Sequence, residues 1–381
     1  MRWNEPAPRE REAGERSWHV VRAAWEAHSP QPPPRRNRGR LVAIAVALLI
    51  VAAILSPPGL AVLGSIRDAV RGEKNAKPAL FALPSAGRLL LESARGAWVV
   101  QRDGSKRLLS GYRDASWSPH GLYLAAVQDH ELRALEPTGK VHWSLARGGT
   151  IRFPVWSDAI PPCCRIAYLA GTQLRVVNGD GTGDHLVAAR AADVAPAWRP
   201  RTHQLAYVEP SGRVRVVDSD TLRTVADWRQ GTPTQLAWSA DGRLIAVRTA
   251  EHPIYVLRPD GTFVEGMSTA SLSPGNPFSA LAFHPRNDSL ATVSYDPGTN
   301  RSQVETSSVS GGADQTVFKG PGRFDGVNWS PNGRWLVLHW VDADQLLFIR
   351  VESARKLPRA VSNIAADFGA DPRLAGWCCT G

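Results

Sequence analysis

The sequence lacks the short motifs that carry common catalytic and nucleotide-binding chemistry. Its 381 residues contain no G-x-S-x-G nucleophile turn, no H-E-x-x-H metal-binding helix, no P-loop, and no G-x-G-x-x-G sequence after a strand. The ten histidines are scattered along the chain. These absences argue against hydrolases, metalloproteases and nucleotide-dependent enzymes. They predict no catalytic residue, no cofactor and no metal site.

Cysteine is scarce and unusually arranged. The four cysteines form two adjacent pairs, Cys163-Cys164 and Cys378-Cys379, with no C-x-x-C motif and no cysteine–histidine set at zinc spacing. Four cysteines allow three disulfide connectivities, one of which links each adjacent pair, and reduced core cysteines are the remaining alternative. The sequence leaves the connectivity open.

A concentrated basic run is missing from most of the chain. The net charge is +10, but nine Arg and five Glu place +4 of it in residues 1–40, and the other +6 is spread over 341 residues. Nucleic-acid-binding proteins usually concentrate positive charge on one face or stripe. The sequence therefore predicts no nucleic-acid partner.

One long uncharged segment is present near the N-terminus. Residues Leu41 to Ile66 carry no charge, and 41–55 is almost wholly aliphatic. About 20 apolar residues cross a bilayer core of roughly 30 Å, so 41–63 is predicted to be a transmembrane signal-anchor helix. The alternatives are a cleaved signal peptide, for which the preceding segment is too long, and a core helix, which the arginine-rich flank disfavours.

The flanking charges predict the orientation of this segment. Four arginines lie within 35–40, whereas 67–74 mixes Arg and Lys with Asp and Glu. Because Lys and Arg are retained on the cytoplasmic side, residues 1–40 are predicted to be a cytoplasmic tail. A linker over 64–83 and a domain over 84–381 are then extracytoplasmic. The predicted location is the cell membrane, with one span and the lipid bilayer as a partner.

The predicted tail contains one short amphipathic stretch. Over 10–28, Trp18, Val21 and Trp25 recur at helical spacing and form a single apolar stripe. Prolines within 30–34 then end the pattern. The stripe predicts a surface helix on the inner leaflet, and the alternative is a docking helix for a cytoplasmic protein.

The rest of the sequence repeats one phrase. An apolar stretch ends in an aromatic residue, a Ser-Pro-x-Gly-like turn follows, and a second apolar strand begins. The steps between successive aromatics are 39, 42, 40, 45 and 46 residues, the period of four-stranded β-propeller blades. We predict that these aromatics fill the layers between neighbouring blades and do not form a ligand site. They are Trp117, Trp156, Trp198, Trp238, Phe283 and Trp329.

Both ends of the repeat region are incomplete blades. Residues 88–109 hold three strand-like segments, and 372–377 resembles the missing fourth, with Trp377 placed 48 residues after Trp329. A ring loses its free edges only when it closes. We therefore predict an all-β, seven-bladed propeller whose first blade combines both ends, with Trp377 as its aromatic. Six blades with loose ends is the alternative. In the closed ring, a disulfide at Cys378 and Cys379 would clip the closure point.

The W-S-P-x-G phrase followed by a Leu-Ala-Val strand resembles the WD40-like, PD40-type repeats of the TolB propeller family. The resemblance covers roughly residues 80–381, and the phrase lacks the Gly-His and Trp-Asp dipeptides of the eukaryotic WD40 signature. It implies an extracytoplasmic interaction platform. Neither the α/β domain of TolB nor the hydrolase domain of propeller-bearing peptidases is expected here.

One loop has some features of a calcium site. Asn178 to Asp184 offers side-chain oxygens at alternating positions, but Ala189 stands where a calcium loop needs a bidentate Glu. Asp-Gly pairs recur at the turns of other blades, so an inter-strand turn is the favoured interpretation.

Together these features predict a non-catalytic, membrane-anchored, extracytoplasmic propeller that binds a protein, a peptide or a cell-envelope component. The first alternative is a transmembrane sensor whose tail binds a cytoplasmic transcription regulator through 10–28. The second alternative is an enzyme with its site at the mouth of the propeller channel. Two carboxylates beside an Arg or His at that mouth would favour the enzyme.

Overall fold

The structure is a computed structural model, and its described part begins at residue 82. The predicted tail helix (10–28), membrane segment (41–63) and nearly all of the linker lie outside the described residues, as does Cys163. Among the residues that are described, no helix is long and apolar enough to cross a membrane. The described ranges are 82–158, 164–229, 231–251, 254–268, 278–309, 314–352 and 358–379.

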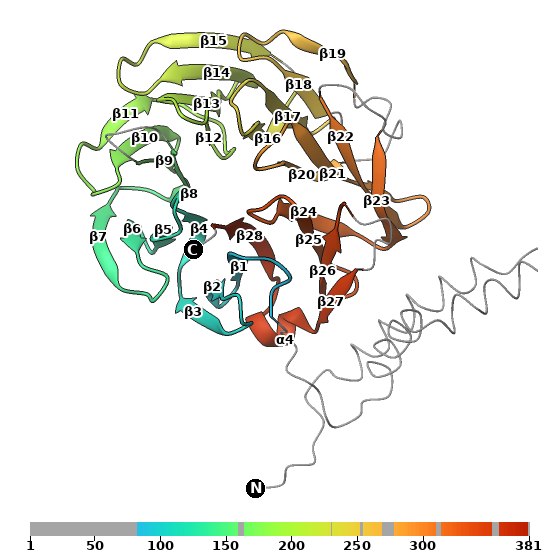
Figure 1. The fold of residues 1–381 in the computed structure, drawn as a ribbon. Helices are drawn as coiled ribbons and strands as arrows, with labels where there is room; N and C mark the ends of the chain where they lie inside the picture. The colour runs from blue at the N-terminus through green and yellow to red at the C-terminus, as the bar shows by residue number, and fades with distance from the viewer. Residues whose placement is uncertain are drawn as a thin grey trace, which may run out of the picture. The chain divides into compact units, whose positions relative to one another are not determined.

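Seven four-stranded antiparallel sheets follow one another around a ring (Figure 1). The prediction of a seven-bladed propeller is confirmed, and the six-bladed alternative is excluded. Six blades are continuous segments, whereas the first combines β28 with β1, β2 and β3. We number the blades in chain order from this first one.

The strands of each blade run from the inside of the ring outward. Blade 1 consists of β28 (Arg373–Cys378), β1 (Arg88–Ser93), β2 (Gly96–Val100) and β3 (Lys106–Ser110); blade 2 of β4 (Arg113–Trp117), β5 (Leu124–Gln128), β6 (Glu131–Leu135) and β7 (Val141–Ala146); blade 3 of β8 (Ile151–Trp156), β9 (Arg165–Ala170), β10 (Gln173–Asn178) and β11 (His185–Ala188); blade 4 of β12 (Ala197–Trp198), β13 (Gln204–Val208), β14 (Arg213–Asp218) and β15 (Thr224–Arg229). Blade 5 consists of β16 (Pro233–Trp238), β17 (Ile245–Thr249), β18 (Ile254–Leu257) and β19 (Phe263–Ser268); blade 6 of β20 (Phe278–Phe283), β21 (Ser289–Asp296), β22 (Arg301–Ser308) and β23 (Gln315–Pro321); blade 7 of β24 (Phe324–Trp329), β25 (Trp335–Trp340), β26 (Gln345–Arg350) and β27 (Arg359–Ser362).

The Ser-Pro-x-Gly phrase forms the turn between the first two strands of a blade. The hydroxyls of Ser118, Ser239 and Ser330 each accept the backbone N–H of the residue five positions later, at 2.9–3.0 Å. The turn glycine donates its own N–H back to the serine carbonyl, at 2.8–2.9 Å. A serine hydroxyl is suited to such local backbone capping, so the phrase fixes where each inner hairpin reverses.

The middle strands are buried on both faces because each sheet lies between two neighbouring blades. Strand β5, Leu-Ala-Ala-Val-Gln, has four consecutive buried residues, and β25 repeats the pattern. Such continuous apolar runs are typical of strands that are covered on both sides. The core is therefore divided into layers between the blades.

The ring closes through the C-terminal strand, as the sequence predicted. Strand β28 pairs antiparallel with β1, and the pairs Leu89↔Trp377 and Glu92↔Arg373 fix the register. The short helix α4 (Ile364–Phe368) precedes β28 and packs against blade 1, where Phe368 meets the Trp98 ring edge-on at 5.5 Å. The closing strand is thus held both by its ladder and by the helix before it.

The disulfide near this point does not clip the ring. Cys378 is bonded to the adjacent Cys379, so the link joins neighbours in one strand end and crosses no blade boundary. Cys164 is also disulfide-bonded, and the described residues contain no free cysteine. Closure therefore depends on hydrogen bonds and packing.

Candidate functional site

Antiparallel pairing sorts the loops of the propeller onto two faces. Connections between the first and second strands, and between the third and fourth, lie on one face, which we call the turn face because it carries the Ser-Pro-x-Gly turns. Connections between the second and third strands, and those that lead to the next blade, lie on the opposite face, which we call the link face. Ligands of propellers bind on such loop faces or at the channel mouth.

The aromatics of the repeat all lie in innermost strands, at or next to the strand end on the turn face. Trp156, Trp198, Trp238, Trp329 and Trp377 are only 7–8% exposed. Trp117 and Phe283 are half-buried. None of the five buried rings offers a face to a ligand.

Three of these tryptophans carry a bond between blades that the sequence analysis missed. The indole N–H of Trp198 donates to the carbonyl of Val155 at 2.9 Å, in the preceding blade. Trp238 and Trp329 donate in the same way to Ala197 and Ala282, both at 3.1 Å. Each acceptor directly precedes the aromatic of the previous blade. The preference for Trp over Phe at these positions was the available signal, since only Trp has a ring N–H.

A second repeated bond joins neighbouring blades at the turn glycines. Arg88 donates to the carbonyl of Gly121 at 2.5 Å, and Arg199 donates to that of Gly242 at 2.8 Å. Both glycines have left-handed φ angles, +66° and +69°. A Cβ on either glycine would meet the arginine of the preceding blade at 2.9–3.2 Å. Glycine is required there both by backbone conformation and by the side chain that approaches it.

His284 makes the same contact in blade 6. Its Nε2 donates to the carbonyl of Gly333 at 3.2 Å, while its Nδ1 accepts the backbone N–H groups of Arg286 and Asn287 at 3.1 Å. This arrangement suits a neutral imidazole, and burial lowers the pKa of His284. The histidine is a turn residue, as the sequence suggested, and it is not part of a histidine cluster.

Two half-buried carboxylates lie on the link-face side of blades 1 and 2. The innermost strand β4 has a register shift between Arg113 and Ser116. Glu92, from blade 1, accepts the Ala115 N–H within that irregular stretch. Asp114, which has a positive φ of 49°, accepts in turn the N–H of Phe153 in blade 3. Bulges leave backbone groups outside the ladder, and these carboxylates satisfy them.

The environment perturbs both carboxylates. Burial raises the pKa of Glu92 to about 7, and the nearby charge of Asp114 adds to the rise, whereas the Ala115 N–H and the Arg373 guanidinium oppose it. Burial also raises the pKa of Asp114, against the Phe153 N–H. Carboxylates with raised pKa values mark candidate functional sites, although structural networks produce them as well.

Polar side chains reach from one blade to the next elsewhere in the ring. Gln235 in blade 5 donates to the carbonyl of Leu281 at 3.2 Å. Ser279 in blade 6 donates to the carbonyl of Phe324 at 2.8 Å. In both cases the acceptor belongs to the innermost strand of the next blade. Glu92 and Asp114 therefore belong to a wider set of inter-blade bonds around the channel.

The loop from Asn178 to Asp184 is built as a turn with an ion-pair network. Asp180 accepts both the backbone N–H and the hydroxyl of Thr182, at 2.9 and 2.7 Å. Asp184 accepts bonds from Tyr168, Arg147 and Arg175, and burial together with this carboxylate raises the pKa of Tyr168 to about 12. Within the described ranges no three His, Cys, Asp or Glu side chains are grouped as a metal would require.

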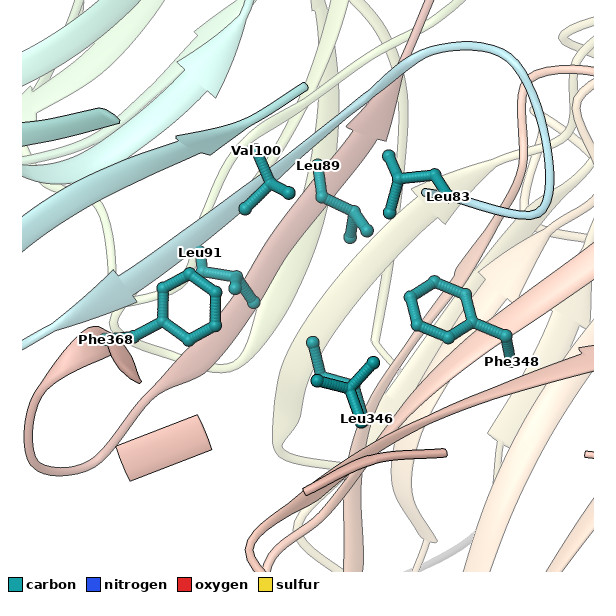
Figure 2. Close-up of a pocket in the computed structure, with 8 residues that line it drawn as sticks. Leu83, Leu89, Leu91, Val100, Leu346, Phe348 and Phe368 are labelled. Carbon is teal, nitrogen blue, oxygen red and sulfur yellow. The ribbon is translucent and has the colours of Figure 1, made fainter. Parts of the chain in front are cut away.

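A small apolar cavity lies where the ring closes, between blades 1 and 7 (Figure 2). Its volume is about 10 Å³, which is room for roughly one water molecule. Its walls offer almost no polar group, so the cavity is a packing gap and not a ligand site. The lining residues are Leu83, Leu89, Leu91, Val100, Leu346, Phe348, Val361 and Phe368.

Comparison with known proteins supports the fold alone. No protein-family model matches the sequence, and no curated protein matches it. Among solved structures, Hsv2 of Kluyveromyces lactis superposes with a TM-score of 0.52 at 12% identity, over 70% of this chain and 90% of that one. A chain of the mitotic checkpoint complex gives 0.52 at 17% identity, over 70% and 86%. The Cps50 (Swd1) β-propeller domain of Myceliophteria_thermophila gives 0.50 at 13% identity, over 66% and 86%. The chain therefore has a WD40-like seven-bladed propeller fold, an architecture that typically serves as a protein-interaction platform.

Proposed function

We propose that this chain is a membrane-anchored propeller that lies outside the cytoplasm and binds a protein, a peptide or a cell-envelope component without catalysing a reaction. One observation carries the proposal: the polar groups around the channel and between the blades are engaged by bonds within the ring. Glu92 and Asp114 accept backbone N–H groups, and Arg88 and Arg199 donate to turn glycines. The exposed loops are the groups that remain for recognition.

The anchor and the location are supported by the sequence. An uncharged run at 41–63 follows an arginine cluster at 35–40, and this order predicts an inner tail and a translocated propeller. The W-S-P-x-G phrase, which resembles TolB-type repeats, agrees with an extracytoplasmic site. Protease added outside spheroplasts should cut near residues 67–80 and spare the tail. Protection of the propeller would contradict the orientation.

Binding is tested on the full chain in its own membrane. A photo-crosslinking amino acid at Asn332, in a turn-face loop, and a second at Thr299, in a link-face loop, sample the two faces. A discrete adduct from one position, lost when the propeller is unfolded, is the expected result. The absence of any adduct from several positions on both faces would contradict a role as a binding platform.

The channel-mouth enzyme is a second candidate because of Glu92. A carboxyl group with a pKa of about 7 suits a proton donor, and Asp114 and Arg373 lie near it. Binding without catalysis is favoured because both carboxylates already accept backbone bonds. An activity on any envelope glycan or peptide that Glu92→Gln abolishes, with folding intact, would reverse this preference.

The sensor alternative uses the same anchor and adds a partner inside the cell. It rests on the Trp18, Val21 and Trp25 stripe within 10–28. Binding of a cytoplasmic transcription regulator to residues 1–40, and its loss in a Trp18→Ala, Trp25→Ala variant, is the result that would favour it.

A further inference from the structure

Four consecutive blades present one exposed arginine each on the turn face. Arg201 and Arg286 directly follow the turn proline of blades 4 and 6, and Arg243 and Arg334 directly follow the turn glycine of blades 5 and 7. All four are exposed. We call these four residues the arginine arc. Because the loops that carry them are the innermost ones on this face, the arc borders half of the channel mouth.

The side chains of the arc are almost free. Only Arg243 has an acidic partner among the described residues, Asp241 at 3.7 Å, and both are largely exposed. Such a pair contributes little in water. Within the described part of the chain, the guanidinium groups of Arg201, Arg286 and Arg334 make no hydrogen bond or ion pair, so the structure of the propeller itself does not use them.

Arginines elsewhere in the propeller are employed differently. On the link-face side, Arg152 pairs with Asp193, and Arg113 donates to the carbonyl of Asp129 at 2.9 Å. Arg147 pairs with Asp184. The contrast shows that this chain can neutralise its arginines within the fold and does not do so along the arc.

The other half of the same face is apolar. The turn of blade 2 exposes Leu122 by 62% and Tyr123 by 37%. Beside it lies the disulfide at the end of β28, where the Cys379 sulfur is 3.2 Å from the carbonyl of Pro119. Charged and apolar contact surfaces thus meet across one channel mouth.

From this arrangement we infer that the turn face binds an acidic polypeptide segment that also carries an apolar side chain. Guanidinium groups match carboxylates in shape and charge, and they can bind them in a bidentate manner. Leu122 and Tyr123 would receive the apolar side chain. The inference deepens the proposed binding function and rests on it, because it names the chemical class of the partner.

Two details favour a polypeptide over a phosphate chain or an anionic membrane. The arc loops also contain Asp241 and Asp288, which would repel a continuous line or sheet of negative charge. A polypeptide can place neutral residues opposite them. The exposed apolar side chains form one local pair, whereas insertion into lipid uses a broader apolar face.

The test compares two variants of the full chain. The arc variant carries Arg201→Ala, Arg243→Ala, Arg286→Ala and Arg334→Ala. The control carries Arg190→Ala and Arg323→Ala, two exposed arginines on the link face. The probe is a fluorescent peptide that alternates glutamate with alanine and ends in phenylalanine, and a matched peptide has lysine in place of glutamate. Fluorescence anisotropy measures binding, and thermal melting checks that each variant folds.

We expect the wild type to bind the glutamate peptide and not the lysine peptide. The arc variant should bind at least about tenfold more weakly, and the control within about twofold of the wild type. Binding should also weaken as salt is added. Equal binding by the arc variant and the wild type, or equal binding of the two peptides, would overturn the inference. Arc-dependent binding of vesicles rich in phosphatidylglycerol, without peptide binding, would overturn it in favour of a membrane.

Failure here can be distinguished from failure of the proposed function. If a turn-face or link-face crosslinker captures the same partner from the wild type and the arc variant alike, the platform stands and the arc inference fails. If no position captures a partner, the proposed function itself fails.

Discussion

Blades 1 and 5 have the same four-stranded order but different covalent histories. Blade 5 is one continuous segment, whereas blade 1 brings β28 from the far end of the chain to β1. In blade 5 the Trp238 indole donates to the previous blade, and in blade 1 the Trp377 indole has no hydrogen-bond partner among the described residues. Blade 1 instead gains α4, with Ser93 donating to the carbonyl of Phe368 at 2.7 Å. The comparison teaches that a split blade replaces one inter-blade bond with local packing.

Removing the closing strand should have the largest effect. Deletion of residues 373–381 exposes the inner edge of β1, opens the ring and removes Trp377 from the core. We expect the melting temperature of the propeller to fall by at least about 10 °C. Deleting only residues 380–381 serves as the control. An unchanged melting curve would mean that closure contributes nothing to the stability of the ring.

A large cavity in blade 5 should come next. Trp238→Ala removes a side chain that is 8% exposed and lies between blades 4 and 5. We expect a loss of about 3–5 kcal/mol in the free energy of unfolding, measured by chemical denaturation. A loss under about 1 kcal/mol would show that the ring is not packed as a core residue.

The raised pKa of Glu92 predicts a pH dependence that blade 5 does not share. Its ordinary value is 4.5 and its value in the fold is about 7, so between these values the folded state binds the proton more tightly. Stability should therefore decrease as pH rises from about 4.5 to about 7, by about 1–3 kcal/mol. Glu92→Gln keeps an acceptor for the Ala115 N–H and should flatten this profile. A variant profile identical to that of the wild type would exclude Glu92 as the source.

A pair of conservative substitutions should sharpen the comparison with the smallest effect. Trp238→Phe leaves the Ala197 carbonyl without its indole donor, and should cost about 1 kcal/mol beyond the change in size. Trp377→Phe loses no such bond and should cost less. Denaturation of the two variants side by side measures the difference. Equal losses would show that the indole bonds contribute nothing net to stability.

The sequence predicted the architecture well because the repeat is a local signal with a fixed period. The aromatic, the turn serine and the turn glycine are read along the chain, and Trp377 falls near the same period. Contacts between blades are not local, so they leave no such trace. Glu92 looked like any charged strand residue, and its role became visible only when the bulged strand of blade 2 was placed against it. Arg199 and His284 interrupted the Ser-Pro phrase for the same kind of reason, because they bond to the next blade.

The closing strand also determines when the protein can finish folding. Strand β28 is the last strand along the chain, and its partner β1 is the first. Six blades can form as synthesis and export proceed, but β1 must wait with an open edge until every other strand has been delivered. During that interval an incomplete ring is recognisable to chaperones and proteases by the same edge. Completion of the first blade is therefore a built-in checkpoint that only a full-length, fully translocated molecule passes.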